Sequence, residues 1–242
     1  MIRTHRFNSE WYGQPAGILS DLAFFALDSR ERSRELGRYA WVELRLPLGP
    51  SIPHELIRAA GFWYADTQLP FRVGLAGVAE LPKTSSVERL VVRSAEERPF
   101  RISADEMAPF EHERFASLPG VDSVRLADRY ARWANELVST SPRTCLWIEE
   151  PSGAPVGWFL SAPEGGLLRL AVAMLHRGAR VSGMLLYHRA LLAYSSLGYR
   201  VGFASFSVTN TPVHNIYARL GARFQRPEGE WLWVRSKEEP HE

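Results

Sequence analysis

Apolar side chains recur along this chain with two different spacings, which predict a mixture of strands and helices. Strict alternation and short apolar runs predict strands, whereas apolar positions three or four residues apart predict helices. In the first third of the chain we expect strands at residues 39–46 and 62–73, and helices at residues 22–36 and 53–60. Pro53 suits the first turn of its helix, and Gly61 suits the position just after the helix ends.

The rest of the chain has a clearer pattern. Ser103 and Glu106 have the spacing of a capping box, which predicts a helix running toward residue 115. A turn of Pro, Ser, Gly and Ala at residues 151–154 separates two apolar runs, as in a β-hairpin. The other expected elements are strands at residues 87–93, 144–149, 155–160, 167–172, 201–208 and 231–234, and helices at residues 124–138, 181–197 and 212–220.

The order of these elements predicts the fold class. A hairpin of strands followed by strand, helix, strand, helix and strand gives a mixed α/β sheet rather than a doubly wound parallel one. Small residues, Pro and Ser at residues 74–86 indicate a linker between two blocks. We therefore expect a smaller N-terminal α/β domain at residues 1–82, and a domain at residues 83–242 with a mixed, mostly antiparallel sheet flanked by helices.

Composition narrows the functional classes. The 242 residues carry a net charge of only +2, which gives no electrostatic footprint for nucleic acid. Cys145 is the only cysteine, which excludes an intramolecular disulfide and a zinc site built from cysteines. The N-terminus resembles no signal peptide, and no apolar run approaches the ~20 residues that span a bilayer. We expect a cytoplasmic protein that binds neither a membrane, nor nucleic acid, nor a metal.

A strand that leads into an Arg- and Gly-containing loop and then into a helix is the first candidate for chemistry. The loop contains Arg177 and Gly178, and the helix is expected to begin near Val181. A helix N-terminus presents unpaired N–H groups and a positive dipole end, which suit a pyrophosphate. Arg177 and Arg180 add positive charge. On these grounds alone, a turn that binds no ligand is the simpler interpretation.

Two motifs in the second half of the chain resemble a known family. Arg177 occupies the first place of an R/Q-x-x-G-x-G/A loop, although Arg180 stands at the middle glycine and Ser182 at the last small residue. Further along, Asn210 follows a strand, and a helix with Tyr217 ends in Leu-Gly-Ala. This spacing over residues 166–234 resembles the acetyl-CoA half of the GNAT N-acetyltransferases.

Shorter matches resemble one group within that family. Residues 7–13, residues 61–68 and the C-terminal segment 231–235 are similar to the dTDP-fucosamine acetyltransferases, which carry an extra N-terminal domain. The resemblance implies transfer of an acetyl group from acetyl-CoA to a primary amine, by direct attack in a ternary complex. It implies a nucleotide-linked amino sugar as the acceptor, with a polyamine, an antibiotic or a protein N-terminus as alternatives.

The resemblance also implies a set of site residues. Tyr217 is the expected general acid, with a core residue as the alternative, because it shares a helical face with Val213 and Leu220. Asn210 is expected to contact CoA, or to cap a helix, or both. The expected acetyl-CoA-binding residues are Leu170, Ala171, Val172, Ala173, Arg177, Gly178, Ala179, Arg180, Val181, Ser182, Gly183, Asn210 and Tyr217.

No general base stands out from the sequence. Glu164, His176 and Glu230 are candidates, and ordinary surface roles are the alternative for each. Asp66 and Glu10 are polar candidates in the N-terminal domain, which we expect to shape the acceptor site. A second functional class also stays open, because Arg180 replaces a loop glycine: a degenerate GNAT domain that binds acyl-CoA or a partner protein without catalysis. Whether the chain is a monomer or a homodimer is open.

Overall fold

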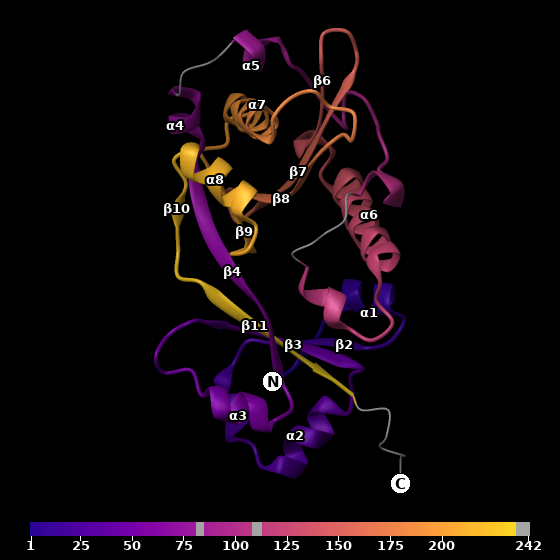
Figure 1. Cartoon of the computed structure of the whole chain (residues 1–242), viewed down its shortest axis with the longest axis vertical. Helices are drawn as coiled ribbons and strands as arrows, with labels where there is room; N and C mark the ends of the chain where they lie inside the picture. The colour runs from indigo at the N-terminus through magenta and orange to yellow at the C-terminus, as the bar shows by residue number, and fades with distance from the viewer. Residues whose placement is uncertain (81–84, 108–112, 236–242) are drawn as a thin grey trace. The chain divides into compact units, whose positions relative to one another are not determined.

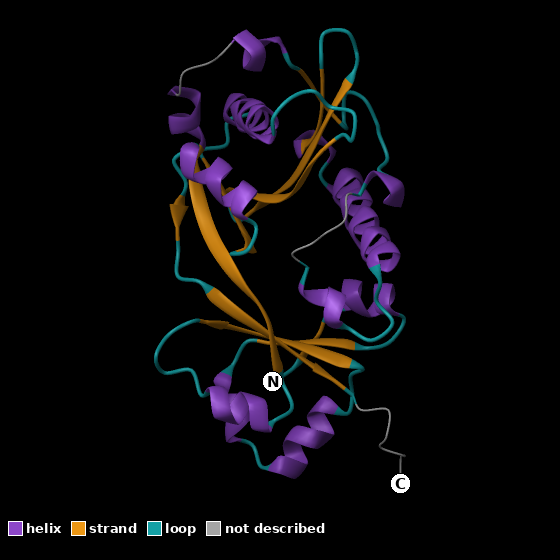
Figure 2. Ribbon diagram, in the orientation of Figure 1, coloured by secondary structure: helices purple, strands orange, loops and turns teal. Residues whose placement is uncertain are grey.

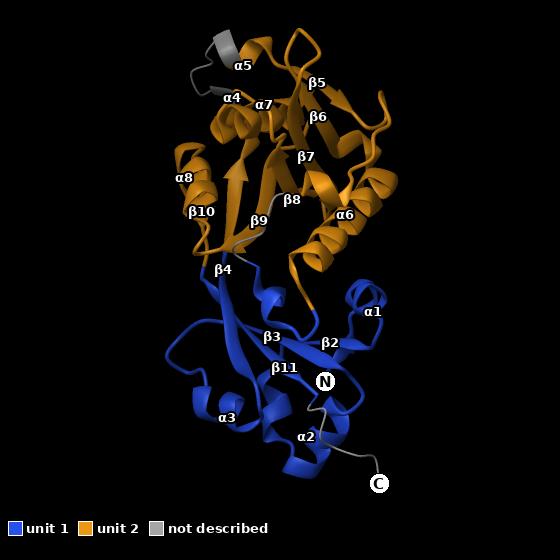
Figure 3. Ribbon diagram, turned by 45° about the vertical axis from the view of Figure 1, so that its right-hand side comes forward, with its two compact units in different colours: residues 1–69, 113–120, 226–242 blue, residues 70–112, 121–225 orange. Residues whose placement is uncertain are grey.

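Strand β4 (Trp63–Gly74) runs through both of the structural units into which the chain divides (Figure 1). The computed structural model describes residues 1–80, 85–107 and 113–235. Unit 1 comprises residues 1–69, 113–120 and 226–242, and unit 2 comprises residues 70–112 and 121–225 (Figure 3). We describe each unit by itself.

Unit 1 is built on a sheet whose strands follow the order β1-β2-β3-β11-β4. Its parallel pair is β2 with β3, and β11 pairs antiparallel with both β3 and β4. The strands are β1 (Arg3–Thr4), β2 (Ala16–Leu19), β3 (Trp41–Pro47), β11 (Glu228–Val234) and the first part of β4. The helices are α1 (Arg6–Tyr12), α2 (Ser29–Leu36) and α3 (His54–Ala59), with 3₁₀ helices at Leu22–Ala26 and Arg114–Ser117.

The two faces of strand β3 differ, and this difference positions the polar cluster described below. Val42, Leu44 and Leu46 point into a core with Phe24 and other apolar side chains, as alternation requires. The intervening residues lie on the opposite face, where Trp41 packs 5.2 Å from the Phe115 ring. Glu43 and Arg45 belong to this second face.

Unit 2 has a sheet with the strand order β4-β9-β8-β7-β6-β5, and β10 pairs with β4. The pairs β5–β6, β6–β7 and β7–β8 are antiparallel, and β8 pairs with β9 in parallel. The strands are β5 (Val91–Ser94), β6 (Cys145–Glu149), β7 (Pro155–Glu164), β8 (Leu167–Leu175), β9 (Val201–Ser207) and β10 (Arg223–Phe224). The helices are α4 (Leu75–Glu80), α5 (Ser85–Arg89), α6 (Ser123–Thr140), α7 (Gly183–Ser196) and α8 (Thr211–Arg219), with 3₁₀ helices at Ala104–Glu106 and Pro142–Thr144.

Alternate side chains of β6 and β7 enter two separate cores of unit 2. Ile148 and Phe159 pack with α7 and α8, whereas Cys145 and Trp158 pack with α6. Helices therefore cover both faces of these strands, as Figure 2 shows. The sheet is buried on both sides, which explains the long apolar runs in its sequence.

Several sequence predictions match these elements, and others are corrected. The helix expected at residues 22–36 is divided into a 3₁₀ helix (Leu22–Ala26) and α2, because Leu27 and Asp28 are extended. The mixed α/β class is confirmed, and the strands and helices from residue 123 onward begin and end within a few residues of their predicted bounds. Residues 85–89 are helical rather than the start of a strand. Glu88 lies in the first turn of this helix, where its negative charge interacts favourably with the positive N-terminal end of the helix dipole. The capping box at Ser103 exists but opens a single 3₁₀ turn, because Met107 is extended. Residues 108–112 of that predicted helix lie outside the described residues.

The linker predicted at residues 74–86 is also corrected. Residues 75–80 of this segment form α4, and both Leu75 and Val78 are buried in the core of unit 2. The two units are discontinuous along the sequence, and the expected domain boundary at residue 82 stays a prediction. Residues 81–84 lie outside the described part of the chain.

Candidate active site

Strands β8 and β9 separate soon after they pair. Their ladder contains only Leu168 with Gly202 and Arg169 with Phe203, although β8 continues to Leu175. Beyond Arg169 the edge of β8 that faces β9 is therefore outside this ladder. Backbone N–H and C=O groups on such an edge are strong hydrogen-bonding groups that a ligand can use. The predicted ligand-binding residues 170–173 lie on this part of β8.

A β-bulge interrupts β8 at the same place. On the side of β7, Ser161 pairs with Leu170 and Leu160 pairs with Val172, which leaves Ala171 as the extra residue. A bulge re-aims the backbone groups around it and is common beside active sites. The expected acetyl-CoA-binding segment at residues 170–173 thus has backbone geometry that differs from a regular strand.

The predicted phosphate loop leads directly into α7. Arg177 and Arg180 are exposed, and Ser182 is the N-cap of a 14-residue helix. The Ser182 side chain makes no capping hydrogen bond, and the first turn contains no acidic residue. Among the described residues, only glycines have a positive φ. The backbone of Arg180 is therefore not in the left-handed region that favours glycine. The missing loop glycine therefore imposes no strain at Arg180.

Asn210 and Tyr217 occupy the two ends of α8. The side-chain oxygen of Asn210 accepts a hydrogen bond from the Val213 N–H at 3.3 Å, which makes it the helix N-cap. Tyr217 is buried, and its ring centroid lies 4.0 Å from that of Phe71. Burial raises the pKa of the Tyr217 phenol well above its ordinary value, and Tyr187 adds to the shift. The phenol is therefore protonated at neutral pH and is a proton donor.

Tyr187 on α7 is an aromatic neighbour that the sequence interpretation missed. Its ring meets the Tyr217 ring edge-to-face, with the centroids 5.3 Å apart. Burial raises the pKa of the Tyr187 phenol as well. The missed signal is a second tyrosine four residues after Gly183, at the start of the helix that follows the phosphate loop.

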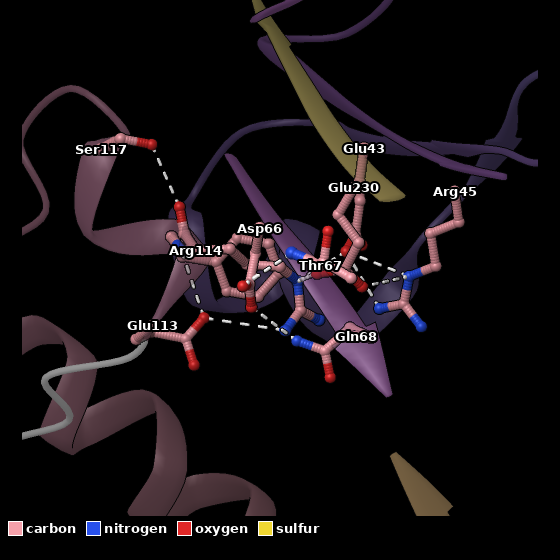
Figure 4. Close-up of polar contacts among 10 residues, drawn as sticks. Glu43, Arg45, Asp66, Thr67, Gln68, Glu113, Arg114, Ser117 and Glu230 are labelled. Carbon is pink, nitrogen blue, oxygen red and sulfur yellow. Dashed lines mark hydrogen bonds and ion pairs between the residues drawn. The ribbon is translucent and has the colours of Figure 1, made fainter. Parts of the chain in front are cut away.

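Unit 1 contains a buried charged cluster, shown in Figure 4, that joins Glu43, Arg45, Arg114 and Glu230. Arg114 comes from a 3₁₀ helix, and its Nε lies 2.6 Å from Oε1 of Glu43 and 3.0 Å from Oε2 of Glu230. Arg45 contacts the same two carboxylates at 2.9 and 3.1 Å. The contacts to Glu230 have ion-pair distances, but its oxygens lack hydrogen-bond geometry with any described partner.

The two carboxylates of this cluster shift in opposite directions. Burial by itself raises the pKa of Glu43, but the charges of Arg114 and Arg45 outweigh it and lower the value to about 2. Burial raises the pKa of Glu230 to about 8; Arg114 opposes that rise, and the neighbouring Glu43 adds to it. The two carboxyl groups interact and titrate as a pair, with the pKa of Glu230 raised and that of Glu43 lowered.

Asp66 joins this cluster because of a second β-bulge. Trp231 pairs with Tyr64 and Glu230 pairs with Asp66, which leaves Ala65 unpaired on β4. Trp231 belongs to the apolar core and Glu230 to the opposite face, so the bulge turns Asp66 toward Glu230. Its carboxylate accepts hydrogen bonds from the Thr67 N–H and from Nε2 of Gln68, both at 2.7 Å.

Neither a protein-family model nor a curated protein matches this sequence. Among solved structures, a conserved protein of unknown function from Staphylococcus epidermidis is 14% identical, covers 92% of this chain and 84% of its own, and has a TM-score of 0.56. A GCN5-related N-acetyltransferase from Kribbella flavida is 13% identical, with 92% and 82% covered and a TM-score of 0.51. The chain has the fold of the GCN5-related N-acetyltransferases (the GNAT fold). It spans 60% of a member from Sphaerobacter thermophilus, at 16% identity and a TM-score of 0.48.

Within the GNAT fold, the predicted site residues of unit 2 all lie on three pieces of structure. Residues 170–173 are on β8, residues 177–183 form the loop and the start of α7, Asn210 is the N-cap of α8, and Tyr217 is on α8. Three other candidates have surface roles. Glu164 pairs with Arg169 at 3.0 Å, Glu10 pairs with Arg6 at 2.8 Å, and His176 accepts a bond from the Gly178 N–H.

Two negative findings apply only to the residues that the structure describes. No helix there is long and apolar enough to span a bilayer. No group of three or more His, Cys, Asp or Glu side chains within residues 1–80, 85–107 and 113–235 is arranged to hold a metal ion.

Proposed function

We propose that this chain transfers an acetyl group from acetyl-CoA to a primary amine of a small molecule. The observation that carries the proposal is the early separation of β8 and β9, with the bulge at Ala171 on the separated part. A thioester-bearing chain bound along this edge accepts hydrogen bonds from N–H groups that no strand ladder occupies. The GNAT fold of the chain supports the same reaction class.

Each predicted residue has a role in this proposal. The backbone of residues 170–173 binds the pantetheine chain and polarises the thioester carbonyl. The loop from Arg177 to Gly183 binds the pyrophosphate, because the helix N-terminus and two exposed arginines face an anion favourably. Asn210 caps α8 through its oxygen, and its amide nitrogen makes no hydrogen bond among the described residues, so we assign that nitrogen to CoA.

The transfer is one nucleophilic substitution. The amine nitrogen attacks the thioester carbon, the carbon–sulfur bond breaks, and the sulfur leaves as a thiolate. Tyr217 gives its phenolic proton to that thiolate as the general acid. The amine arrives unprotonated and, after attack, loses its surplus proton to water, which later restores the Tyr217 phenol.

The acceptor that we propose is an amino sugar on a nucleotide carrier. Support comes from the sequence resemblance of residues 7–13 and 61–68, which correspond to α1 and to the start of β4 in unit 1. Unit 1 then shapes the acceptor site. Asp66 is the acceptor-binding candidate in this segment, since a bulge turns it away from the apolar core.

The alternative is a degenerate domain that binds acyl-CoA or a partner protein without catalysis, and Arg180 at the usual glycine position favours it. Two measurements separate the alternatives. The thermal unfolding temperature is followed with acetyl-CoA and with CoA, and thiol release is followed with nucleotide-linked amino sugars, a polyamine, an aminoglycoside and a peptide amine. Stabilisation with turnover supports the enzyme, and stabilisation without any turnover supports the degenerate domain.

A matched pair of variants shows where CoA binds. Arg177→Ala is expected to raise the Kd for acetyl-CoA about tenfold, because a charge-assisted contact to phosphate is lost. Arg30→Ala, which removes an exposed arginine from α2, is expected to leave that Kd unchanged. If acetyl-CoA produces no thermal shift in the wild-type chain, the enzyme proposal is wrong, and a degenerate domain that binds a partner protein is the alternative that stays open.

A further inference from the structure

Tyr187 lies between two other aromatic rings of unit 2. Its ring centroid is 5.1 Å from that of Phe159 and 5.3 Å from that of Tyr217, with interplanar angles of 78° and 80°. Both contacts are edge-to-face, the arrangement that the charge distribution of aromatic rings favours. Two such contacts restrain the orientation of the Tyr187 ring.

The two ring contacts of Tyr187 connect it to strands on either side of the point where β8 and β9 separate. Phe159 is on β7, directly opposite Ala173 of β8, where the ladder with β9 has already ended. Tyr217 stacks on Phe206 of β9, with the ring planes 11° apart. The Tyr187–Tyr217 contact therefore bridges the β7–β8 side and the β9 side at the level where we place the thioester.

We propose that Tyr187 is a positioning residue that holds the Tyr217 phenol in the orientation needed for proton transfer to the thiolate. The inference rests on the proposed acetyl transfer and on Tyr217 as its acid. Phe71 packs on the same Tyr217 ring with the centroids 4.0 Å apart, and Tyr187 adds an edge contact from another helix. Without the Tyr187 ring, Tyr217 keeps its contacts with Phe71 and Phe206 and loses the one that comes from α7.

The role belongs to the ring of Tyr187 rather than to its hydroxyl. The contacts that Tyr187 makes with Phe159 and Tyr217 are ring contacts, and no hydrogen bond of the Tyr187 hydroxyl is found among the described residues. Tyr187→Phe keeps the ring and removes the hydroxyl, whereas Tyr187→Leu removes the ring. The two substitutions therefore separate positioning from a second proton-donating phenol.

The test measures kcat and KM for these variants, alone and combined with Tyr217→Phe. Tyr187→Phe is expected to keep kcat within about twofold, and Tyr187→Leu to lower kcat about tenfold with little change in the KM for acetyl-CoA. In the Tyr217→Phe background, Tyr187→Leu is expected to cause no further loss, because no acid is left to position. Tyr199→Leu, which removes a ring from the same core without a ring contact to Tyr217 among the described residues, is the control and keeps kcat.

Several outcomes overturn the inference. An equal loss of kcat in Tyr187→Phe and Tyr187→Leu assigns the role to the hydroxyl. If Tyr187→Leu lowers kcat equally in the wild-type and Tyr217→Phe backgrounds, the two residues act independently. If Tyr187→Leu fails to fold, Tyr187→Met replaces it as a ringless side chain that fills irregular space. A wild-type chain that binds no acetyl-CoA contradicts the proposed function itself, whereas an active wild type with an unaffected Tyr187→Leu contradicts only the role of Tyr187.

Discussion

Asp66 on β4 lies directly opposite Glu230 on β11, so that two carboxyl side chains share one cross-strand position in unit 1. Like charges at such a position destabilise a sheet. Burial is the largest cause that raises the pKa of Glu230 to about 8, and Asp66 adds to the rise. A neutral Glu230 relieves the repulsion, so the stability of this unit depends on pH near neutrality.

We predict that the wild-type chain loses stability as the pH rises from about 5 to about 8.5, and that Glu230→Gln loses less. The folded-state pKa of Glu230 is raised from 4.5 to about 8, so its stabilising contribution is complete below pH 4.5 and is lost as the pH rises through 8. The contribution of Glu43, whose pKa is lowered to about 2, is lost only as the pH falls below 4.5. Urea unfolding at pH 5.5, 7 and 8.5 measures the difference.

The matched control for this prediction is Glu164→Gln. Glu164 pairs with Arg169 at 3.0 Å on the surface, with 60% of its side chain exposed. Its substitution is expected to leave the pH dependence of the wild type intact. A parallel fall in stability with pH for the wild type and Glu230→Gln contradicts a protonated Glu230.

Arg114→Met is predicted to destabilise the folded chain by about 3 kcal/mol, because a buried carboxylate loses its partner. Arg114 is 15% exposed and contacts Glu43 and Glu230, which are each 1% exposed. Arg132→Met, which breaks a surface pair with Asp128 at 2.7 Å, is predicted to cost less than about 1 kcal/mol. Chemical unfolding of both variants at pH 7 gives the comparison, and equal costs are the contrary result.

The charged cluster shows why part of this molecule could not be predicted from its sequence. Arg114 lies 71 residues from Glu43 in the chain and belongs to a short 3₁₀ helix without apolar periodicity. No pattern in the sequence around Arg114 predicts that its side chain contacts a strand that is distant in the chain. Glu230 was a candidate base by residue type alone, and its burial beside Glu43 is a consequence of strand order.

The proposed acetyl-CoA site was more predictable, because its residues lie within about 50 positions and follow local rules. Asn210 caps a helix that begins with Pro212, and Ser182 precedes a helix that follows a loop. Spacing alone put Tyr217 on the buried face of its helix. The contact with Tyr187 was missed because it depends on how α7 packs against α8, which periodicity within one helix does not determine.

Two tyrosines of unit 2 are predicted to respond in opposite ways to loss of the hydroxyl. Tyr217→Phe is expected to lower kcat about 10²- to 10⁴-fold while acetyl-CoA still raises the melting temperature, because general-acid catalysis is lost and binding is not. The stability of the chain is expected to change little, since no hydrogen bond of the Tyr217 hydroxyl is found among the described residues.

Tyr194→Phe provides the contrast. The Tyr194 hydroxyl donates to the backbone oxygens of Thr144 at 2.8 Å and Phe159 at 3.0 Å. Its loss is expected to cost about 1–3 kcal/mol of stability, because buried acceptors lose their donor. Thermal unfolding and kcat, measured for both variants, test the pair. Unchanged turnover in Tyr217→Phe removes Tyr217 as the acid.

Alanine substitutions at two glycines of unit 2 are predicted to change the free energy of unfolding in opposite directions. A Cβ on Gly157 of β7 would lie 2.2 Å from the Met174 oxygen of β8, so Gly157→Ala is expected to destabilise by about 1–3 kcal/mol. A Cβ on Gly77 of α4 meets nothing within 4 Å, so Gly77→Ala is expected to stabilise by about 0.5–1 kcal/mol. Stabilisation by Gly157→Ala would falsify the close approach of β7 to β8.

The strand order of unit 1 has a consequence for folding during synthesis on the ribosome. β11 lies between β3 and β4, yet it is synthesised after every other described strand. Until it emerges, β3 and β4 lack the partner that separates them and expose unpaired strand edges, which are sites of aggregation. Most of unit 2 leaves the ribosome earlier. We expect unit 1 to be the part of the nascent chain that depends on chaperones.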